Sequence, residues 1–287
     1  MPLRSTFAAA LLAGLLLAAP GARGQDPGEG PKGGIPVARL TFVERLVEHA
    51  GDAGTWRKAK EGSPFRTGER LRTAPDAVAR IDFPWMSLTL GPASVVTVPN
   101  TYVLSTVLEQ GRVQLHAEGR DILKLRTPDA EVRGRGRVVV RRERQATLVM
   151  SLGGRFVVEG SGKTVALAKG KGTIVLAGRQ PIPPVDLPAP PEGLWPGIDP
   201  VFVGAGKSIA LTWNAGGPSH YVELLPVGSD LVLLQRDVGP PPWRIEIPWT
   251  GAFRWRVSAR DGRGLEGVPS AEGLICVVEK RRAPRTN

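Results

Sequence analysis

The sequence predicts an all-β protein in which a β-solenoid or β-roll domain precedes an immunoglobulin-like β-sandwich. Three observations support this prediction. Apolar residues alternate with polar ones in many short runs, which places one face of each strand in a core and the other in water. Gly (36 residues) and Pro (27 residues) separate these runs, as turns between strands require. After the N-terminus, no long stretch is rich in helix-favouring residues.

The first 24 residues have the features of a secretory signal peptide. Arg4 supplies the basic start, residues 7–19 form an apolar run, and small residues precede a cut near Gly24. The run is shorter than the ~20 residues that span a bilayer, although an uncleaved N-terminal anchor is the alternative. We therefore expect a periplasmic or extracellular protein without a transmembrane segment after cleavage, beginning with a flexible leader at residues 25–36.

Residues 37–178 are predicted to form the first all-β domain. Ala77, Ala79 and Ile81 alternate with Val78 and Arg80, so they are expected to share a buried face. Residues 40–49 fit either a helix or a pair of strands. The same period-two pattern recurs at Leu88 and Leu90, Val113 and Leu115, Leu123 and Leu125, Val165 and Leu167, and Ile174 and Leu176.

Residues 179–196 are predicted to be a Pro-rich, semi-rigid linker, because proline favours extended polyproline geometry. Residues 197–279 then carry about seven strand-like runs, as in an immunoglobulin or fibronectin type III sandwich. Trp213 and Trp255 fall on the inward phase of this pattern and are expected in its core. Residues 280–287 form a basic tail, which is predicted to be disordered.

Short motifs in a fixed order resemble the FecR domain of bacterial envelope proteins. They are residues 67–73 (TGERLRT), 79–83 (ARIDF), 108–113 (LEQGRV), 125–130 (LRTPDA) and 176–178 (LAG). The acidic turn of that family is replaced here by residues 84–87 (PWMS), and its glycine-rich "V.GT.F.V" segment by residues 132–138 (VRGRGRV). Residues 251–259 (GAFRWRVSA) resemble a strand of the fibronectin-like modules that follow such domains. The resemblance implies a sensor or regulator that acts on the envelope side of a membrane.

The sequence indicates no catalytic, cofactor or metal site. Residues 160–164 (GSGKT) and 204–208 (GAGKS) look like phosphate-binding loops, but Val157 and Val201 occupy the position of the required first glycine. We expect both to be tight turns. The three histidines, His49, His116 and His220, are scattered, without a partner at metal-ligand spacing. We therefore expect a protein that is not an enzyme; a cryptic carbohydrate-active enzyme built from distant carboxylates is an alternative.

An arginine run is the strongest charge feature of the chain, whose formal net charge is +11. Because guanidinium groups bind phosphate and carboxylate through two parallel hydrogen bonds, the run is a candidate docking strip for an anionic partner. The competing interpretation is a solvated hairpin face balanced by Glu131 and Glu143. Nucleic acid is not expected, because no aromatic residues interleave for base stacking. The run consists of Arg133, Arg135, Arg137, Arg141, Arg142 and Arg144.

These observations predict an exported, non-catalytic binding or scaffold protein of the bacterial envelope. Its partner would be an envelope protein or an anionic wall or lipid polymer, since a basic exported chain meets such polymers first. The alternative is a periplasmic accessory factor that relays an envelope signal to a separate membrane regulator.

Overall fold

The computed structural model describes residues 36–51, 54–84, 86–98, 105–117 and 122–279. The predicted signal peptide, nearly all of the leader, Trp85 and the basic tail lie outside these described residues. Every regular element in the described ranges is a strand, so the all-β prediction is confirmed. No helix there could cross a membrane.

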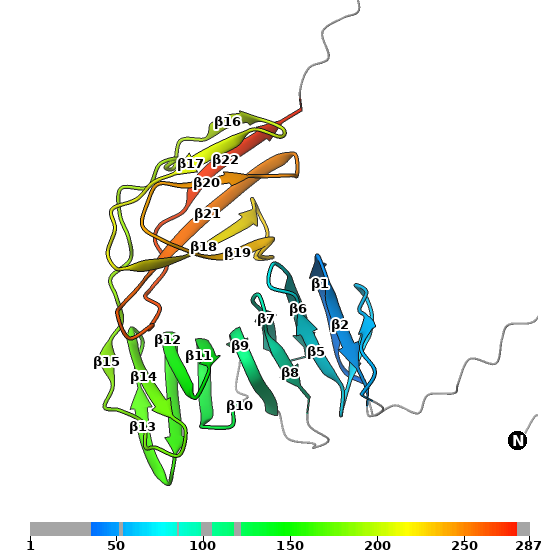
Figure 1. Ribbon diagram of the computed structural model, residues 1–287, viewed down its shortest axis with the longest axis vertical. Helices are drawn as coiled ribbons and strands as arrows, with labels where there is room; N and C mark the ends of the chain where they lie inside the picture. The colour runs from blue at the N-terminus through cyan, green and yellow to red at the C-terminus, as the bar shows by residue number, and fades with distance from the viewer. Residues whose placement is uncertain (1–35, 52–53, 85, 99–104, 118–121, 280–287) are drawn as a thin grey trace, which may run out of the picture. The chain divides into compact units, whose positions relative to one another are not determined.

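Residues up to Asp186 contribute fifteen strands to one sheet, which Figure 1 shows following one another from blue to green. The central path of this sheet runs β15-β14-β12-β11-β10-β9-β7-β6-β1-β4. The strands are β1 (Pro36–Glu44), β2 (Val47–Ala50), β3 (Arg57–Lys58), β4 (Pro64–Arg66), β5 (Arg70–Thr73), β6 (Val78–Phe83), β7 (Met86–Leu90), β8 (Val95–Thr97), β9 (Ser105–Ala117), β10 (Leu123–Arg126), β11 (Glu131–Glu143), β12 (Ala146–Gly160), β13 (Lys163–Leu167), β14 (Lys171–Leu176) and β15 (Val185–Asp186).

Residues from Val201 onward form two further sheets. One has five strands in the order β16-β22-β21-β18-β19, and the other pairs β17 with β20. Both sheets and the fifteen-stranded sheet belong to one compact unit. The strands are β16 (Val201–Gly204), β17 (Ser208–Leu211), β18 (Ser219–Pro226), β19 (Leu234–Val238), β20 (Trp243–Glu246), β21 (Gly251–Arg260) and β22 (Gly273–Val278).

The three longest strands each take part in two layers of the large sheet. The first half of β9 pairs with β8 and β10, whereas its second half pairs with β7 and β11. Likewise, β11 pairs first with β10 and then with β9, and β12 pairs first with β14 and then with β13. The sheet therefore bends over itself, as in a β-roll, and glycines mark the bends: Gly111 in β9, Gly136 in β11 and Gly154 in β12 all have positive φ.

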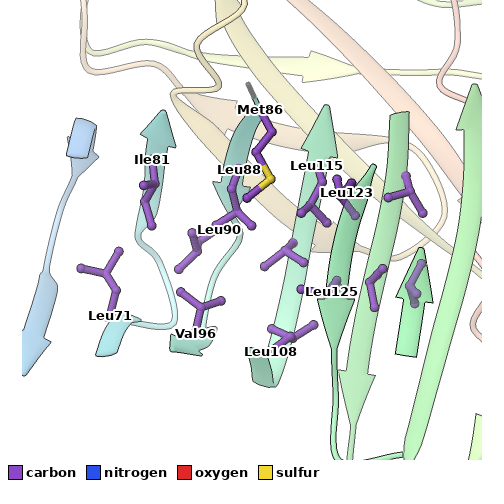
Figure 2. Close-up of a cluster of buried hydrophobic side chains, with 14 of the residues drawn as sticks. Leu71, Ile81, Met86, Leu88, Leu90, Val96, Leu108, Leu115, Leu123 and Leu125 are labelled. Carbon is purple, nitrogen blue, oxygen red and sulfur yellow. The ribbon is translucent and has the colours of Figure 1, made fainter. Parts of the chain in front are cut away.

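The main core lies between these layers and draws side chains from both. Figure 2 shows Leu88 and Leu115 on neighbouring strands of this cluster, together with Leu108, Leu123 and Leu125. All five are at most 1% exposed. The alternation predicted for β6, β7, β9 and β10 is therefore confirmed, and each of these strands turns one apolar face into this core.

A second core fills the sandwich formed by the last seven strands. Trp213 and Trp255 both lie in it, 4% and 0% exposed, with ring centroids 6.1 Å apart. The indole nitrogen of Trp255 donates a hydrogen bond to the carbonyl of Pro196 at 3.0 Å. The prediction that these two tryptophans are core residues is confirmed.

The structure defines two further segments, one with an ambiguous sequence pattern and one predicted to be a semi-rigid linker. Residues 40–49, which fitted a helix or a strand pair, are β1 and β2. The Pro-rich segment lies along the edge of the large sheet, where Ile182 donates to the carbonyl of Ile174 at 3.0 Å and Leu187 to that of Gly170 at 2.9 Å. Main-chain hydrogen bonds thus hold this segment on β14 through β15.

Candidate anion-binding face

The six arginines of the run divide into two groups in the structure. Arg133, Arg135 and Arg137 are exposed on β11, in a stretch that the core residues Val132 and Val138 flank, so they lie outside the roll. Arg144 is also exposed, in the turn between β11 and β12. In contrast, Arg141 is 8% exposed. The single continuous strip suggested by the sequence is therefore interrupted.

Arg141 and Arg142 have structural partners. Arg141 forms ion pairs with Glu143 and, at 3.0 Å, with Asp237 of β19. Arg142 pairs with Asp129 at 3.2 Å and donates to the carbonyl of Glu109 at 2.8 Å. These contacts fasten the end of β11 to its neighbours, so these two guanidinium groups are already engaged within the chain.

A bend in the β11–β12 hairpin presents the exposed arginines. Arg135 lies directly opposite Arg155 of β12, and the next pair in the register is Gly136 with Gly154. A Cβ on Gly136 would lie 2.2 Å from the carbonyl oxygen of Gly153, and one on Gly154 would lie 2.0 Å from that of Arg135. Only glycine permits this close backbone approach, so the glycines between the arginines form the bend.

We call Arg133, Arg135, Arg137 and Arg155 the basic corner. Arg133 forms ion pairs with Glu131 at 3.1 Å and with Glu159 at 2.8 Å. Among the residues that the structure describes, the other three form no ion pair with an acidic side chain, although the charge of Arg137 helps to lower the pKa of Asp230. Like charges directly opposite each other on paired strands are destabilising. At Arg135 and Arg155, the basic corner thus concentrates positive charge that its own sheet leaves uncompensated.

One of the two carboxylates that pair with Arg133 is shared with other cations. Glu131 accepts contacts from Lys124 at 3.0 Å and Arg126 at 2.9 Å as well as from Arg133. Burial alone would raise the pKa of Glu131, but hydrogen bonds from Arg126 and Lys124 outweigh this effect and lower it. Glu131 therefore stays ionised and shared among three cations.

A polar cleft of about 420 Å³ adjoins the basic corner at Arg137. The strand registers align Ser87 of β7, His116 of β9 and Arg137 of β11 in one row across the sheet, continued by Asp82 of β6. Thr89 and Gln114 form the next row. Hydroxyl, amide, imidazole and guanidinium groups therefore line the cleft side by side, as in a site for a hydrated, oxygen-rich ligand.

The carboxylates of this cleft, Asp82 and Asp230, are each held by an arginine. Asp82 is held by Arg80 and by the hydroxyl of Thr41, each at 2.8 Å. Asp230 accepts a hydrogen bond from Arg254, which lowers the pKa of Asp230. A general acid needs a raised pKa so that it keeps its proton near neutrality. Asp230 therefore lacks the raised pKa of a general acid.

A buried polar network, absent from the sequence-based predictions, connects the large sheet to the sandwich. Arg112 of β9 lies over the ring of Tyr221, 4.1 Å from its centroid, and forms an ion pair with Glu266. Glu223 accepts from Arg256 at 2.6 Å. Burial alone would raise the pKa of Glu223, but Arg256 and Arg112 outweigh that effect and lower it. The period-two pattern around Arg112 gives no signal of this burial.

The two segments that look like phosphate-binding loops, and His220, have structural roles. Residues 160–164 contain the turn between β12 and β13, and residues 204–208 the turn between β16 and β17, so both predicted turns are confirmed. His220 is fully buried, with its ring 5.2 Å from that of Trp213. Within the described ranges, no group of three or more His, Cys, Asp or Glu side chains could hold a metal ion.

No family model and no curated protein matches the chain. Two crystal structures of a protein assigned as an anti-sigma factor from Parabacteroides distasonis each match at 16% identity, with TM-scores of 0.37 and 0.36. The matches cover 41% of this chain and 59% of those chains, so this chain spans less than two thirds of their length. Domains A168–A170 of titin match at 14% identity and a TM-score of 0.27, covering 82% of this chain and 89% of that one.

Proposed function

We propose that the protein is an exported, non-catalytic binding module that holds an acidic polysaccharide of the bacterial envelope on its basic corner. The observation that carries this proposal is the position of Arg135 opposite Arg155, since neither forms an ion pair with a described acid. Such a like-charged pair is destabilising in the absence of a counter-charge. A bound anion would remove that cost.

The spacing of the arginines suits a polymer better than a single small anion. Alternate residues of a regular strand are about 7 Å apart, so Arg133 and Arg135 present successive guanidinium forks along β11, and Arg137 follows beyond the bend at Gly136. Each fork can take one carboxylate, sulfate or phosphate group through two hydrogen bonds. A chain with regularly repeated charges can therefore engage several arginines at once, and it gains affinity from this multivalency.

The adjoining cleft favours a sugar backbone for this polymer. Arg137 belongs both to the basic corner and to the cleft lining, where Ser87, Thr89 and Gln114 offer hydroxyl and amide groups. Such groups pair with sugar hydroxyls. A polysaccharide could therefore place charged groups on the basic corner and an adjacent sugar unit in the cleft.

Binding of the full chain to immobilised polygalacturonate at low salt tests this proposal. We expect the double variant Arg135→Ser/Arg155→Ser to bind about tenfold more weakly or worse, because each lost charged hydrogen bond contributes about 1.5–3 kcal/mol. We also expect wild-type binding to weaken with added salt.

The matched control is Arg57→Ser/Lys58→Ser, which removes the same charge from exposed positions on β3. If this control lost as much binding as the basic-corner variant, net charge alone would explain the affinity. Equal binding to neutral dextran would likewise contradict the proposal.

A further inference from the structure

A second cavity, of about 660 Å³, opens where the β11–β12 turn approaches β9 and β19. This volume falls in the range of small-molecule sites. Its lining combines apolar surface from Pro75 and Pro92 with a concentration of positive charge. Five arginines line it: Arg112, Arg141, Arg142, Arg144 and Arg236.

The charges of three of these arginines are balanced by ion pairs with carboxylates of the same chain. Arg112 is bound by Glu266, Arg141 by Asp237 and Glu143, and Arg142 by Asp129. Asp237 is shared further, because Arg260 also pairs with it at 2.6 Å. The two carboxylates that line the cavity, Glu143 and Asp237, are therefore each paired with at least one arginine.

The remaining two arginines come from different sheets. Arg144 projects from the turn of the β11–β12 hairpin, and Arg236 lies on β19 of the sandwich. Within the described part of the chain, neither forms an ion pair; Arg236 donates only to the neighbouring carbonyl of Gln235, at 3.1 Å. Two guanidinium groups from the two sides of one cavity thus lack a counter-charge.

The backbone of Arg144 supplies an independent observation. Its φ is 51°, in the left-handed region that costs a non-glycine residue free energy and that hairpin turns reserve for Gly, Asn or Asp. Ala93, at another edge of the cavity, also has a φ of 51°. Backbone strain of this kind is often found at functional sites, which points to a role for the Arg144 side chain.

We propose that this cavity binds a small organic phosphate, whose phosphoryl group is held between Arg144 and Arg236. The phosphate oxygens would accept from both guanidinium forks. The organic part would lie against the prolines. Because one arginine belongs to the large sheet and the other to the sandwich, the ligand joins the two and stabilises the folded chain.

Thermal unfolding of the full chain in glucose 1-phosphate tests this site, with sodium chloride matching the ionic strength. At a ligand concentration about a hundredfold above its Kd, Tm should be raised by about 5–10 °C, and it should keep rising with the logarithm of the ligand concentration. Glucose alone should give no rise. The proposal would be overturned if glucose 1-phosphate, at every concentration tested, left the Tm no higher than in the sodium chloride control.

The variant Arg144→Gly gives the sharpest comparison, because it removes the guanidinium while relieving the positive-φ strain. Without ligand, Arg144→Gly should be at least as stable as the wild type, yet glucose 1-phosphate should no longer raise its Tm. Arg236→Ser should also lose this response to the ligand. Arg57→Ser, on exposed β3, should retain it. A full Tm rise in Arg144→Gly would refute the site. Polygalacturonate binding should be unaffected by Arg144→Gly. The experiments therefore distinguish a failure of the phosphate site from a failure of the basic corner as a polysaccharide site.

Discussion

Arg112 and Glu266 lie 154 residues apart in the sequence and meet inside the protein through two parallel hydrogen bonds. The Nε of Arg112 is 2.9 Å from one carboxylate oxygen of Glu266, and its Nη2 is 2.8 Å from the other. Their side chains are 5% and 2% exposed. This pair joins β9 of the large sheet to the segment that follows β21 of the sandwich.

Glu266→Ala should destabilise the protein strongly, because it leaves the Arg112 guanidinium buried without its main counter-charge. The expected loss in the free energy of unfolding is about 3–5 kcal/mol, measured by urea denaturation. Arg112→Met/Glu266→Leu is the control, since replacing both partners by apolar residues of similar size is often close to neutral. A double variant as unstable as the single one would show that the loss comes from packing instead.

His220 should make stability depend on pH below neutrality. Burial lowers the pKa of His220 in the folded state, so the unfolded chain, with a pKa near 6.5, takes up a proton first as the pH falls. The free energy of unfolding should therefore decrease from about pH 6.5 downward, and level off for this group once the pH passes its folded pKa. Urea denaturation between pH 7.5 and pH 5 measures this pH dependence of the free energy of unfolding. We expect the variant His220→Phe to show a weaker pH dependence.

Two adjacent glycines of β12 should respond differently to alanine. At Gly154, φ is 90° and a Cβ would lie 2.0 Å from the carbonyl of Arg135; at Gly153 the nearest atom would be 3.9 Å away. Gly154→Ala should therefore lower the free energy of unfolding by about 3 kcal/mol, and Gly153→Ala should change it by less than about 1 kcal/mol. Equal effects in chemical denaturation would be inconsistent with a bend at Gly154.

Arg155→Glu should separate stability from ligand binding at the basic corner. The new carboxylate would face Arg135 across the strand pair, replacing repulsion with attraction worth about 0.2–1 kcal/mol. We expect a slightly raised Tm together with loss of polygalacturonate binding. A variant that binds as tightly as the wild type would remove the basic corner from the proposed function.

Much of the fold follows from local patterns in the sequence. The alternation at Leu88 and Leu90, or at Leu123 and Leu125, predicts buried faces that the structure confirms. Period-two patterns report burial on one side of a strand, but they do not report which strands pair. The division of β9, β11 and β12 between two layers depends on contacts between distant segments, so it could be found only in the structure.

The candidate site could be predicted only in part. The alternation of arginine and glycine at residues 133–137 indicated the exposed face. Arg155 was missed because its importance comes from the register of β12 against β11. Arg141 belongs to the same run in sequence, but Asp237, 96 residues away, makes it a structural residue. Sequence spacing cannot distinguish an exposed arginine from one that a distant carboxylate covers.

The bent hairpin of β11 and β12 also has a consequence for how the molecule unfolds. Because each of its strands is shared by both layers of the roll, neither layer can open without disrupting the other. Backbone amides of β10 and β13 should therefore exchange with deuterated solvent at rates close to those of β9 and β14, as one cooperative folding unit.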